Sequence, residues 1–200
     1  MGKLAGEAVT VDGRRARAER NRDSVVEAIL GLLREGVDNP NVTQIAERSG
    51  VSVRSVFRHF DDLESLYTAA IEVHLQQVGH LFALEVPEGP TVERIAALAA
   101  QRAKLFENIA PIRRAAERRR RSSPAIDQTL GNAHKFLRHQ VKECFEPELS
   151  RADALDRDDL VDALDFVTSW VAWEALRVEQ GLSAARARGV LTLQLSRLLA

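Results

Sequence analysis

The sequence has one cysteine, Cys144, among its 200 residues, which excludes an intramolecular disulfide framework and a metal site built from several thiolates. A chain with so little cysteine is typical of the reducing cytoplasm, where we expect this protein. The sequence also lacks any apolar run close to the roughly 20 residues that span a membrane, so we expect no membrane partner.

Helix breakers are scarce as well, with six prolines and 11 glycines. Alanine and leucine together supply 52 residues, and unbranched side chains of this kind lose little rotamer freedom in a helix. Nearly every segment repeats its apolar residues with a period of 3.6, and none alternates with a period of two. The sequence therefore predicts an all-α protein of about nine helices.

Capping residues and apolar stripes place these helices along the chain. Asn41, Ser52 and Ser183 are suitable N-caps, and Pro87–Glu88–Gly89–Pro90 is the clearest break. The expected helices are 17–35, 42–49, 53–59, one that opens at Asp61 or Asp62, one that includes 95–109, a short basic one that starts at Pro111, one from Pro124 to Pro147, 158–180 and 183–199.

The charge is unevenly distributed, although its net value is only −1. Residues 1–60 carry a net charge of +2, and five arginines lie between positions 14 and 22. We interpret residues 1–16 as a flexible basic arm, in which Arg14 and Arg15, with the adjoining Arg17, follow a DNA backbone or enter the minor groove. The alternative is that these arginines only keep a loose tail soluble.

A second arginine run lies further along the chain, interrupted by two alanines and a glutamate. We interpret it as a solvated helix face rather than a second nucleic-acid site, or as a partner for the acidic segment 153–165. Its members are Arg113, Arg114, Arg118, Arg119, Arg120 and Arg121.

Residues 42–59 have helix-turn-helix proportions, with two short helices joined by Gly50-Val51-Ser52. Glycine suits the sharp turn after the first helix, and we expect Val56 and Phe57 of the second helix to be buried. Its remaining side chains are free to reach base edges and phosphates, or they are simply solvated. The candidates are Ser52, Val53, Arg54, Ser55, Arg58 and His59, with Thr43 at the start of the first helix as a phosphate contact or a local cap.

Residues 41–66, NVTQIAERSGVSVRSVFRHFDDLESL, resemble the DNA-binding segment of the TetR family. The resemblance lies in the Ile-Ala pair before the Gly-Val-Ser turn, the aromatic-X-His-Phe stretch and the acid-leucine element that follows; with the helix before it, it covers about 17–70. It implies a homodimeric transcriptional regulator, usually a repressor, released from a palindromic operator by a small-molecule effector. The implied domains are a DNA-binding domain at 17–62 and a helical effector-binding and dimerisation domain at 63–200.

Three positions depart from the family pattern. Arg54 stands where glycine is common, and its guanidinium suits guanine or a phosphate. Phe57 and Leu63 replace a tyrosine and a lysine that usually hold phosphates in the family, while His59 keeps the family position for a phosphate contact. We therefore include Phe57 among the DNA-binding candidates, although neither it nor Leu63 can replace the missing hydrogen bonds.

Bulky side chains beyond residue 100 are candidates for an apolar effector pocket. These are Leu105, Phe106, Ile109, His134, Leu137, Phe166, Trp170 and Trp173. The last two helices, with leucines such as Leu191 and Leu195, are expected to form the homodimer interface.

The sequence contains no Gly-rich phosphate loop, no Gly-X-Ser-X-Gly elbow and no His-Glu-X-X-His helix. We therefore expect a protein that is not an enzyme and that needs no cofactor and no metal. The alternative function is a helical dimeric interaction protein without operator binding.

Overall fold

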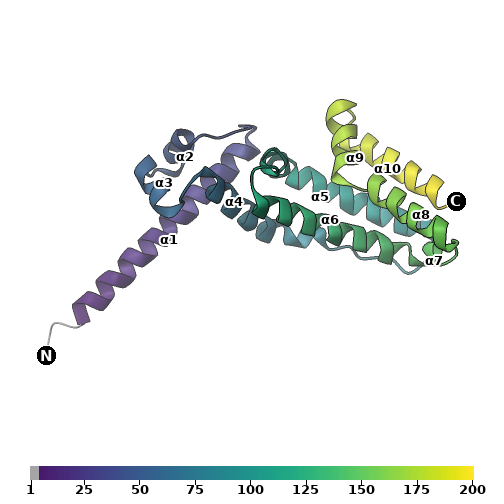
Figure 1. The fold of residues 1–200 in the computed structure, drawn as a ribbon, viewed down its shortest axis with the longest axis horizontal. Helices are drawn as coiled ribbons and strands as arrows, with labels where there is room; N and C mark the ends of the chain where they lie inside the picture. The colour runs from purple at the N-terminus through teal and green to yellow at the C-terminus, as the bar shows by residue number, and fades with distance from the viewer. Residues whose placement is uncertain (1–4) are drawn as a thin grey trace. The chain divides into compact units, whose positions relative to one another are not determined.

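The computed structural model describes the backbone of residues 5–200 and the side chains of 15–153 and 156–200. Within these residues the prediction of an all-α fold is confirmed, because the segment contains helices and no strand (Figure 1). The helices are α1 (Ala5–Arg34), α2 (Val42–Ser49), α3 (Val53–His59), α4 (Leu63–Val78), the 3₁₀ turn η1 (Gly79–Phe82), α5 (Thr91–Arg119), α6 (Pro124–Cys144), α7 (Glu146–Leu149), α8 (Ala154–Val167), α9 (Trp170–Glu174), the π-helical turn η2 (Ala175–Glu179) and α10 (Ala184–Leu198).

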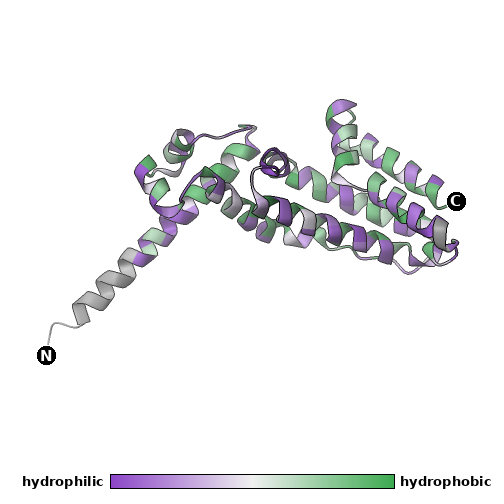
Figure 2. Ribbon diagram, viewed as in Figure 1, coloured by the Kyte–Doolittle hydropathy of each residue, from purple (hydrophilic) through white to green (hydrophobic). Residues whose placement is uncertain are grey.

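The chain divides into two compact units, each with its own core. Unit 1 comprises Met1–Gln77 and Pro111–Ile126, and unit 2 comprises Val78–Ala110 and Asp127–Ala200. Along the helices, hydrophobic residues gather on the inward sides and hydrophilic residues on the outward sides (Figure 2). This is the pattern of amphipathic helices that bury one stripe each.

In unit 1, α1 packs against α2 and α3, and α4 adds buried residues to the same core. Its fully buried side chains include Ile29, Ile45, Leu66 and Tyr67. In unit 2, one apolar cluster includes Leu98, Phe145 and Leu164, and a second contains Leu105, Phe106, Trp170 and Trp173.

Several helix boundaries differ from the sequence prediction. α1 begins at Ala5, not near residue 17, so the segment expected as a flexible arm is helical from that residue onward. α5 runs through Pro111 without a break, because buried Ile109 and Ile112 anchor the helix on both sides of the missing N–H. A short helix, α7, follows α6, and Pro147 lies in its first turn. The expected helix 158–180 is broken, because Ser169 caps a new helix by accepting a hydrogen bond from Ala172 N at 3.2 Å.

Cys144 is a core residue, with 1% of its surface exposed. Burial raises the pKa of its thiol to about 11, so the group is protonated at neutral pH. None of the helices in the described part of the chain combines the length and the apolar character needed to span a bilayer.

Candidate nucleic-acid interface

The helix-turn-helix is built by local capping, as the sequence predicts. The side chain of Asn41 accepts from Gln44 N at 3.0 Å and the Gln44 side chain accepts from Asn41 N at 3.0 Å, which completes a capping box at the start of α2. Gly50 ends α2 with φ +72°, a left-handed conformation that favours glycine. Ser52 then starts α3 by accepting from Ser55 N at 3.2 Å.

Helix α3 has one buried side chain, two half-buried ones and four exposed ones. Val56 is 2% exposed and Phe60, which follows the helix, is 5% exposed. Phe57 is 48% exposed, so the prediction that it is buried is wrong: in this short helix the position after Val56 lies off the inward face. Arg54 and Arg58 are exposed on the outward side.

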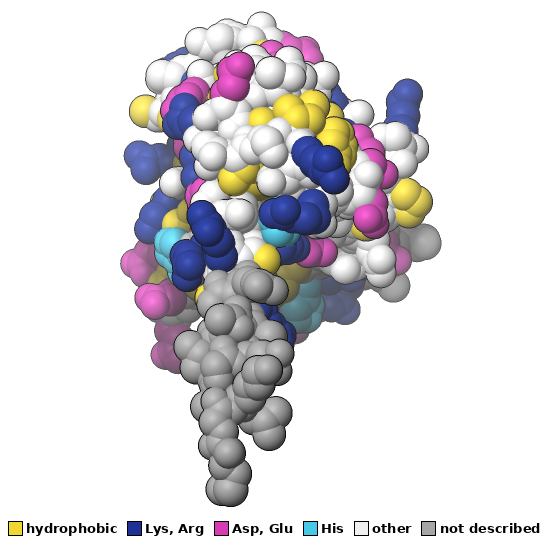
Figure 3. Space-filling model, turned by 90° about the vertical axis from the view of Figure 1, so that its left-hand side faces the viewer, with side chains coloured by type: hydrophobic (Ala, Val, Ile, Leu, Met, Phe, Trp, Pro, Cys, Tyr) yellow, Lys and Arg dark blue, Asp and Glu magenta, His cyan; other side chains and the backbone are white. Residues whose placement is uncertain are grey.

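A basic groove lies between α1 and α3. It has a volume of about 460 Å³ and is lined by Arg17, Ala18 and Asn21 of α1 and by Arg58 of α3. Figure 3 looks onto this end of the molecule and shows Lys and Arg side chains gathered there with histidine. Two guanidinium groups and an amide facing one hollow can donate several hydrogen bonds to a phosphate.

The other arginines of the expected arm have different positions. Arg15 is exposed and pairs with Glu19 at 3.3 Å, and the side chain of Arg14 lies outside the described residues. Arg22, which is not part of the predicted arm, lies over the Phe60 ring, 5.2 Å from its centroid. Among the arm arginines whose side chains are described, Arg17 is the one that lines a groove together with a residue of α3.

The remaining candidates also lie on unit 1. Thr43 is exposed in the first turn of α2, Val53 is 36% exposed, and Ser55 is half-buried, with its backbone N–H bonded to the Ser52 hydroxyl. His59 is half-buried, and burial together with the nearby Arg58 and Arg22 lowers the pKa of His59. A neutral imidazole has one ring N–H available to donate a hydrogen bond.

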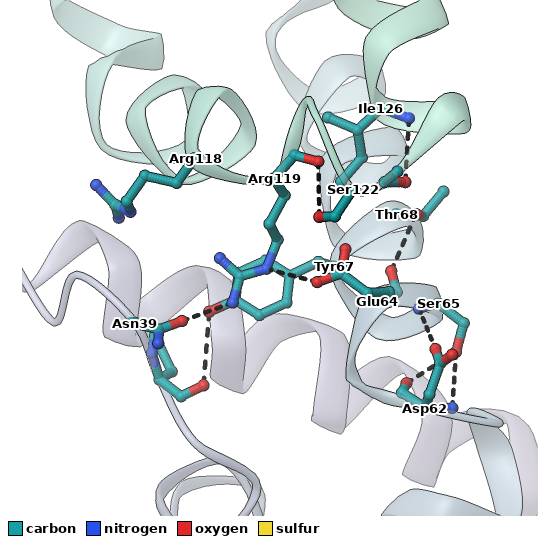
Figure 4. A network of polar contacts seen from close by, with 12 residues as sticks. Asn39, Asp62, Glu64, Ser65, Tyr67, Thr68, Arg118, Arg119, Ser122 and Ile126 are labelled. Atoms are coloured by element: carbon teal, nitrogen blue, oxygen red, sulfur yellow. Dashed lines mark hydrogen bonds and ion pairs between the residues drawn. The ribbon is translucent and has the colours of Figure 1, made fainter.

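Two arginines of α5 hold the loop that leads into the helix-turn-helix (Figure 4). The Arg119 guanidinium lies 3.4 Å from the centroid of the Tyr67 ring, donates to Asn39 Oδ1 at 2.6 Å, and has its Nε 3.3 Å from Glu64 Oε1. Arg118 donates to the backbone carbonyl of Asp38 and lies 3.6 Å from its carboxylate.

The prediction that the run 113–121 is a solvated helix face is therefore wrong for Arg119, which is 9% exposed. It is also wrong for Arg113, whose side chain is 13% exposed and pairs with Glu117 at 2.7 Å. It is right for the exposed side chains of Arg120 and Arg121. A run of arginines gives no sign of which member is buried. The spacing Ile112, Ala115, Ala116, Arg119 follows one helical face and is the signal that identifies Arg119 as buried.

Most of the residues predicted for an effector pocket come together in unit 2. The Phe106 ring lies 5.8 Å from that of Trp170 and 6.3 Å from that of Trp173, and Leu105 and Ile109 belong to the same buried cluster. Leu137 packs against this cluster, partly buried.

Two of the predicted pocket residues lie elsewhere. His134 faces solvent and its Nε2 is 3.4 Å from Asp165 Oδ2, and Phe166 is 63% exposed. Their side-chain types suit a pocket, but their helical positions turn them outward.

The leucines expected at a dimer interface are core residues, because Leu191 and Leu195 are 2% and 0% exposed. The exposed apolar side chains of the last helices are different ones: Phe166 of α8, Val171 of α9 and Leu193 of α10 are each more than half exposed. Helices α8 and α10 pack against each other, and each of them carries one of these exposed apolar side chains.

Comparison with known proteins finds no matching family model and no matching curated relative. Solved structures do match over nearly the whole chain. A transcriptional regulator from Rhodococcus sp. RHA1 superposes with a TM-score of 0.66 at 17% identity, covering 91% of this chain and 95% of that one. A protein described as a TetR-family transcriptional regulator, from Mesorhizobium loti, has a TM-score of 0.61 at 16% identity, covering 92% and 96%. The chain has the TetR fold.

A third structure of this fold was obtained with a small molecule bound. It is a transcriptional regulator from Saccharomonospora viridis in complex with choline, with a TM-score of 0.62 at 16% identity over 88% of this chain and 94% of that one. The fold expected from residues 17–70 thus extends over both units. In the TetR fold, unit 1 carries the helix-turn-helix and unit 2 is the helical domain.

Proposed function

We propose that the protein is a DNA-binding transcriptional regulator that acts as a homodimer and responds to a small molecule. The observation that carries this proposal is the basic groove, in which Arg17 and Asn21 of α1 face Arg58 of α3 beside an exposed, capped helix. Arginine and amide donors around one hollow suit a phosphate of the DNA backbone.

In the proposed complex α3 enters the major groove. Arg54 has an exposed side chain one turn before Arg58 and reads guanine O6 and N7 through its bidentate fork. Phe57, exposed between them, offers an apolar ring suited to a thymine methyl group. Two copies related by a twofold axis read half-sites about 34–36 Å apart, or a multiple of this spacing.

We expect Arg54→Ala to weaken binding to the specific operator far more than binding to random DNA. Removal of a bidentate hydrogen-bonded pair with a base costs about 1–3 kcal/mol. The measurement is fluorescence anisotropy on an operator found by genomic footprinting, with a scrambled duplex of equal length. Equal weakening on both duplexes would show that Arg54 holds only phosphate.

Arg17→Ala and Arg58→Ala provide the matched comparison for this experiment. We expect each to weaken binding to every sequence and to reduce the salt dependence by about one unit of log K per log salt for each phosphate that the protein no longer neutralises. Arg151→Ala, which removes an exposed arginine of unit 2, is the control and should leave both affinities unchanged. Unchanged salt slopes for Arg17 and Arg58 would contradict the role of the basic groove.

We further propose that α8 and α10 form the homodimer interface through their exposed apolar side chains. Leu193→Glu, at a side chain that is 56% exposed, is expected to give folded monomers, because a buried unpaired carboxylate is costly in the interface but not in the monomer. Sedimentation velocity at micromolar concentration measures the assembly. Monomers bind the operator more weakly, since linked half-sites gain effective concentration.

Leu191→Glu is the control for this prediction. Its side chain is 2% exposed within the core of one chain, so the change should unfold unit 2 rather than separate two subunits. A dimeric Leu193→Glu variant with unchanged sedimentation would place the interface on another surface.

A second candidate function is a helical interaction protein that does not bind an operator. The observation in its favour is the half-exposed Phe57 ring, which stands where the family uses a hydroxyl to hold phosphate. Absence of binding to its own upstream DNA at low salt would favour this second function.

A further inference from the structure

The guanidinium of Arg102 is a positive charge buried among neutral acceptors. Its residue is 0% exposed and lies on α5 inside unit 2. One terminal nitrogen donates to Gln140 Oε1 at 3.0 Å and to the amide oxygen of Gln101, and the other donates to the carbonyl of Leu137 at 3.0 Å. None of these acceptors carries a charge, and the Nε of Arg102 has no hydrogen-bond partner among the described residues.

The other buried arginine of unit 2 on the same helix shows how such a charge is usually held. Arg94 is 8% exposed and pairs with the Glu148 carboxylate, with a further bond to the Gly89 carbonyl. Burying an ion costs several kcal/mol unless an opposite charge and hydrogen bonds offset the lost hydration. Burial lowers the pKa of Arg102 only to about 10, so its charge persists at neutral pH.

The two glutamines are fixed with their amide oxygens toward the guanidinium. Gln101 donates its amide N–H to the Leu81 carbonyl at 2.8 Å, and Gln140 donates to the Phe82 carbonyl at 2.7 Å. With their nitrogens held by η1, both amide oxygens turn to the guanidinium. They supply two oxygen atoms without charge, where a carboxylate would supply two oxygen atoms with one negative charge.

The apolar cluster of unit 2 continues from this charge along α5. Arg102, Phe106 and Ile109 follow one helical face at spacings of four and three. The Phe106 ring meets the Trp170 ring edge-on, and Leu137, whose carbonyl accepts from Arg102, packs against the same cluster. A buried cation on the helical face that leads into an apolar cluster suits an apolar molecule that carries one anionic group.

We propose that unit 2 binds a small organic acid, with its single carboxylate paired to the Nε edge of the Arg102 guanidinium, whose Nε has no partner among the described residues, and with its apolar body against Phe106 and Trp170. Planar carboxylate geometry matches the guanidinium fork, and one charge balances one charge. This inference rests on the proposed function only in that the acid is the effector of the regulator.

Thermal unfolding with two pairs of probes tests this inference on the full chain. Octanoate and phenylacetate carry the carboxylate, and octanamide and phenylacetamide have the same shape without the charge. We expect each acid, at about 100 times its dissociation constant, to raise the Tm by about 5–10 °C, and the amides to leave it unchanged. Arg102→Met should remove the shift.

Arg102→Lys is a second variant. It keeps the buried positive charge, so we expect it to fold, but it removes the bidentate geometry of the guanidinium. We expect it to weaken acid binding by about tenfold or more. Arg94→Lys is the matched control, because it makes the same change at the other buried arginine, next to Glu148, and should preserve the acid-induced shift.

The outcomes separate this inference from the proposed function. If neither acid raises the Tm, or if both raise it equally in Arg102→Met and Arg102→Lys, Arg102 is only a structural group and the inference is overturned. The operator-binding measurements without added acid are unaffected by that result. Acid binding that depends on Arg102 in a protein that binds no DNA would support the site and contradict the regulator.

Discussion

Arg119→Met is expected to lower the free energy of unfolding by about 3 kcal/mol, because it removes a desolvated cation–π interaction and a charged hydrogen bond together. The guanidinium covers the Tyr67 ring at 3.4 Å and donates to Asn39 at 2.6 Å. Its removal also leaves the Glu64 carboxylate without the cation 3.3 Å away. Urea denaturation at neutral pH measures the change.

Arg118→Met is the neighbouring control. Its side chain is 42% exposed and faces the carboxylate of Asp38, which is 85% exposed, and exposed pairs of this kind contribute about 0–1 kcal/mol. Amide hydrogen exchange adds a local measurement, in which Arg119→Met should reduce protection in α2 and in the loop around Asn39. Equal destabilisation of the two variants would contradict a special role for Arg119.

Acid should destabilise unit 1 through one buried histidine. His74 is 4% exposed, and neither ring nitrogen has a hydrogen-bond partner among the described residues. Burial, reinforced by the nearby Arg34 and opposed by Glu27, lowers the pKa of His74 to about 4. In the unfolded chain the same side chain takes up its proton near pH 6.5.

The sign of the effect follows from proton binding. Between about pH 6.5 and pH 4 the unfolded state binds one more proton than the folded state, so stability falls as the pH falls through this range. The destabilisation attributable to His74 is about 3 kcal/mol. Below about pH 4 both states are protonated and this contribution stops changing.

His74→Leu isolates this contribution. At about pH 8, the difference in the free energy of unfolding between the variant and the wild type measures the effect on packing alone. The change in this difference between about pH 8 and about pH 4.5 measures the effect of protonating His74. We expect the variant to lose less stability than the wild type over this range. Parallel pH profiles for the two proteins would show that His74 is protonated in the folded state.

The helix-turn-helix could be predicted almost residue by residue because its signals are local. Asn41 and Gln44 cap within one turn, Gly50 takes the left-handed conformation, and Ser52 caps the next helix, all within a dozen residues. Similarly, Ser183 marks the start of α10. Such interactions depend on spacing along the chain, which the sequence states directly.

The errors arose where distant parts of the chain decide. Pro111 has the residue type of a helix start, yet the packing of Ile109 and Ile112 carries α5 through it. The positions of Leu191 and Leu193 differ by only two residues, and only the packing of unit 2 shows which one is buried. Composition predicts how many apolar side chains the protein has, but it does not predict which of them are buried.

The basic groove could be predicted only in part, because it depends on both local spacing and the packing of two helices. A spacing of four places Arg17 and Asn21 on one face of α1, but their meeting with Arg58 depends on how α1 packs against α3. The charge of Arg102 is the extreme case, since nothing in the neighbouring sequence indicates an arginine held only by neutral acceptors.

The discontinuous composition of unit 1 has a consequence for evolution and for engineering. Its core is made by residues up to Gln77 and completed by Pro111–Ile126 from later in the chain, which carry the arginine that covers Tyr67. A DNA-binding domain transferred to another protein as one N-terminal segment would lack Pro111–Ile126. Exchange of operator specificity between such proteins is therefore easier by substitution on α3 than by recombination at a junction after α4, and chimaeras should carry the second segment from the same parent.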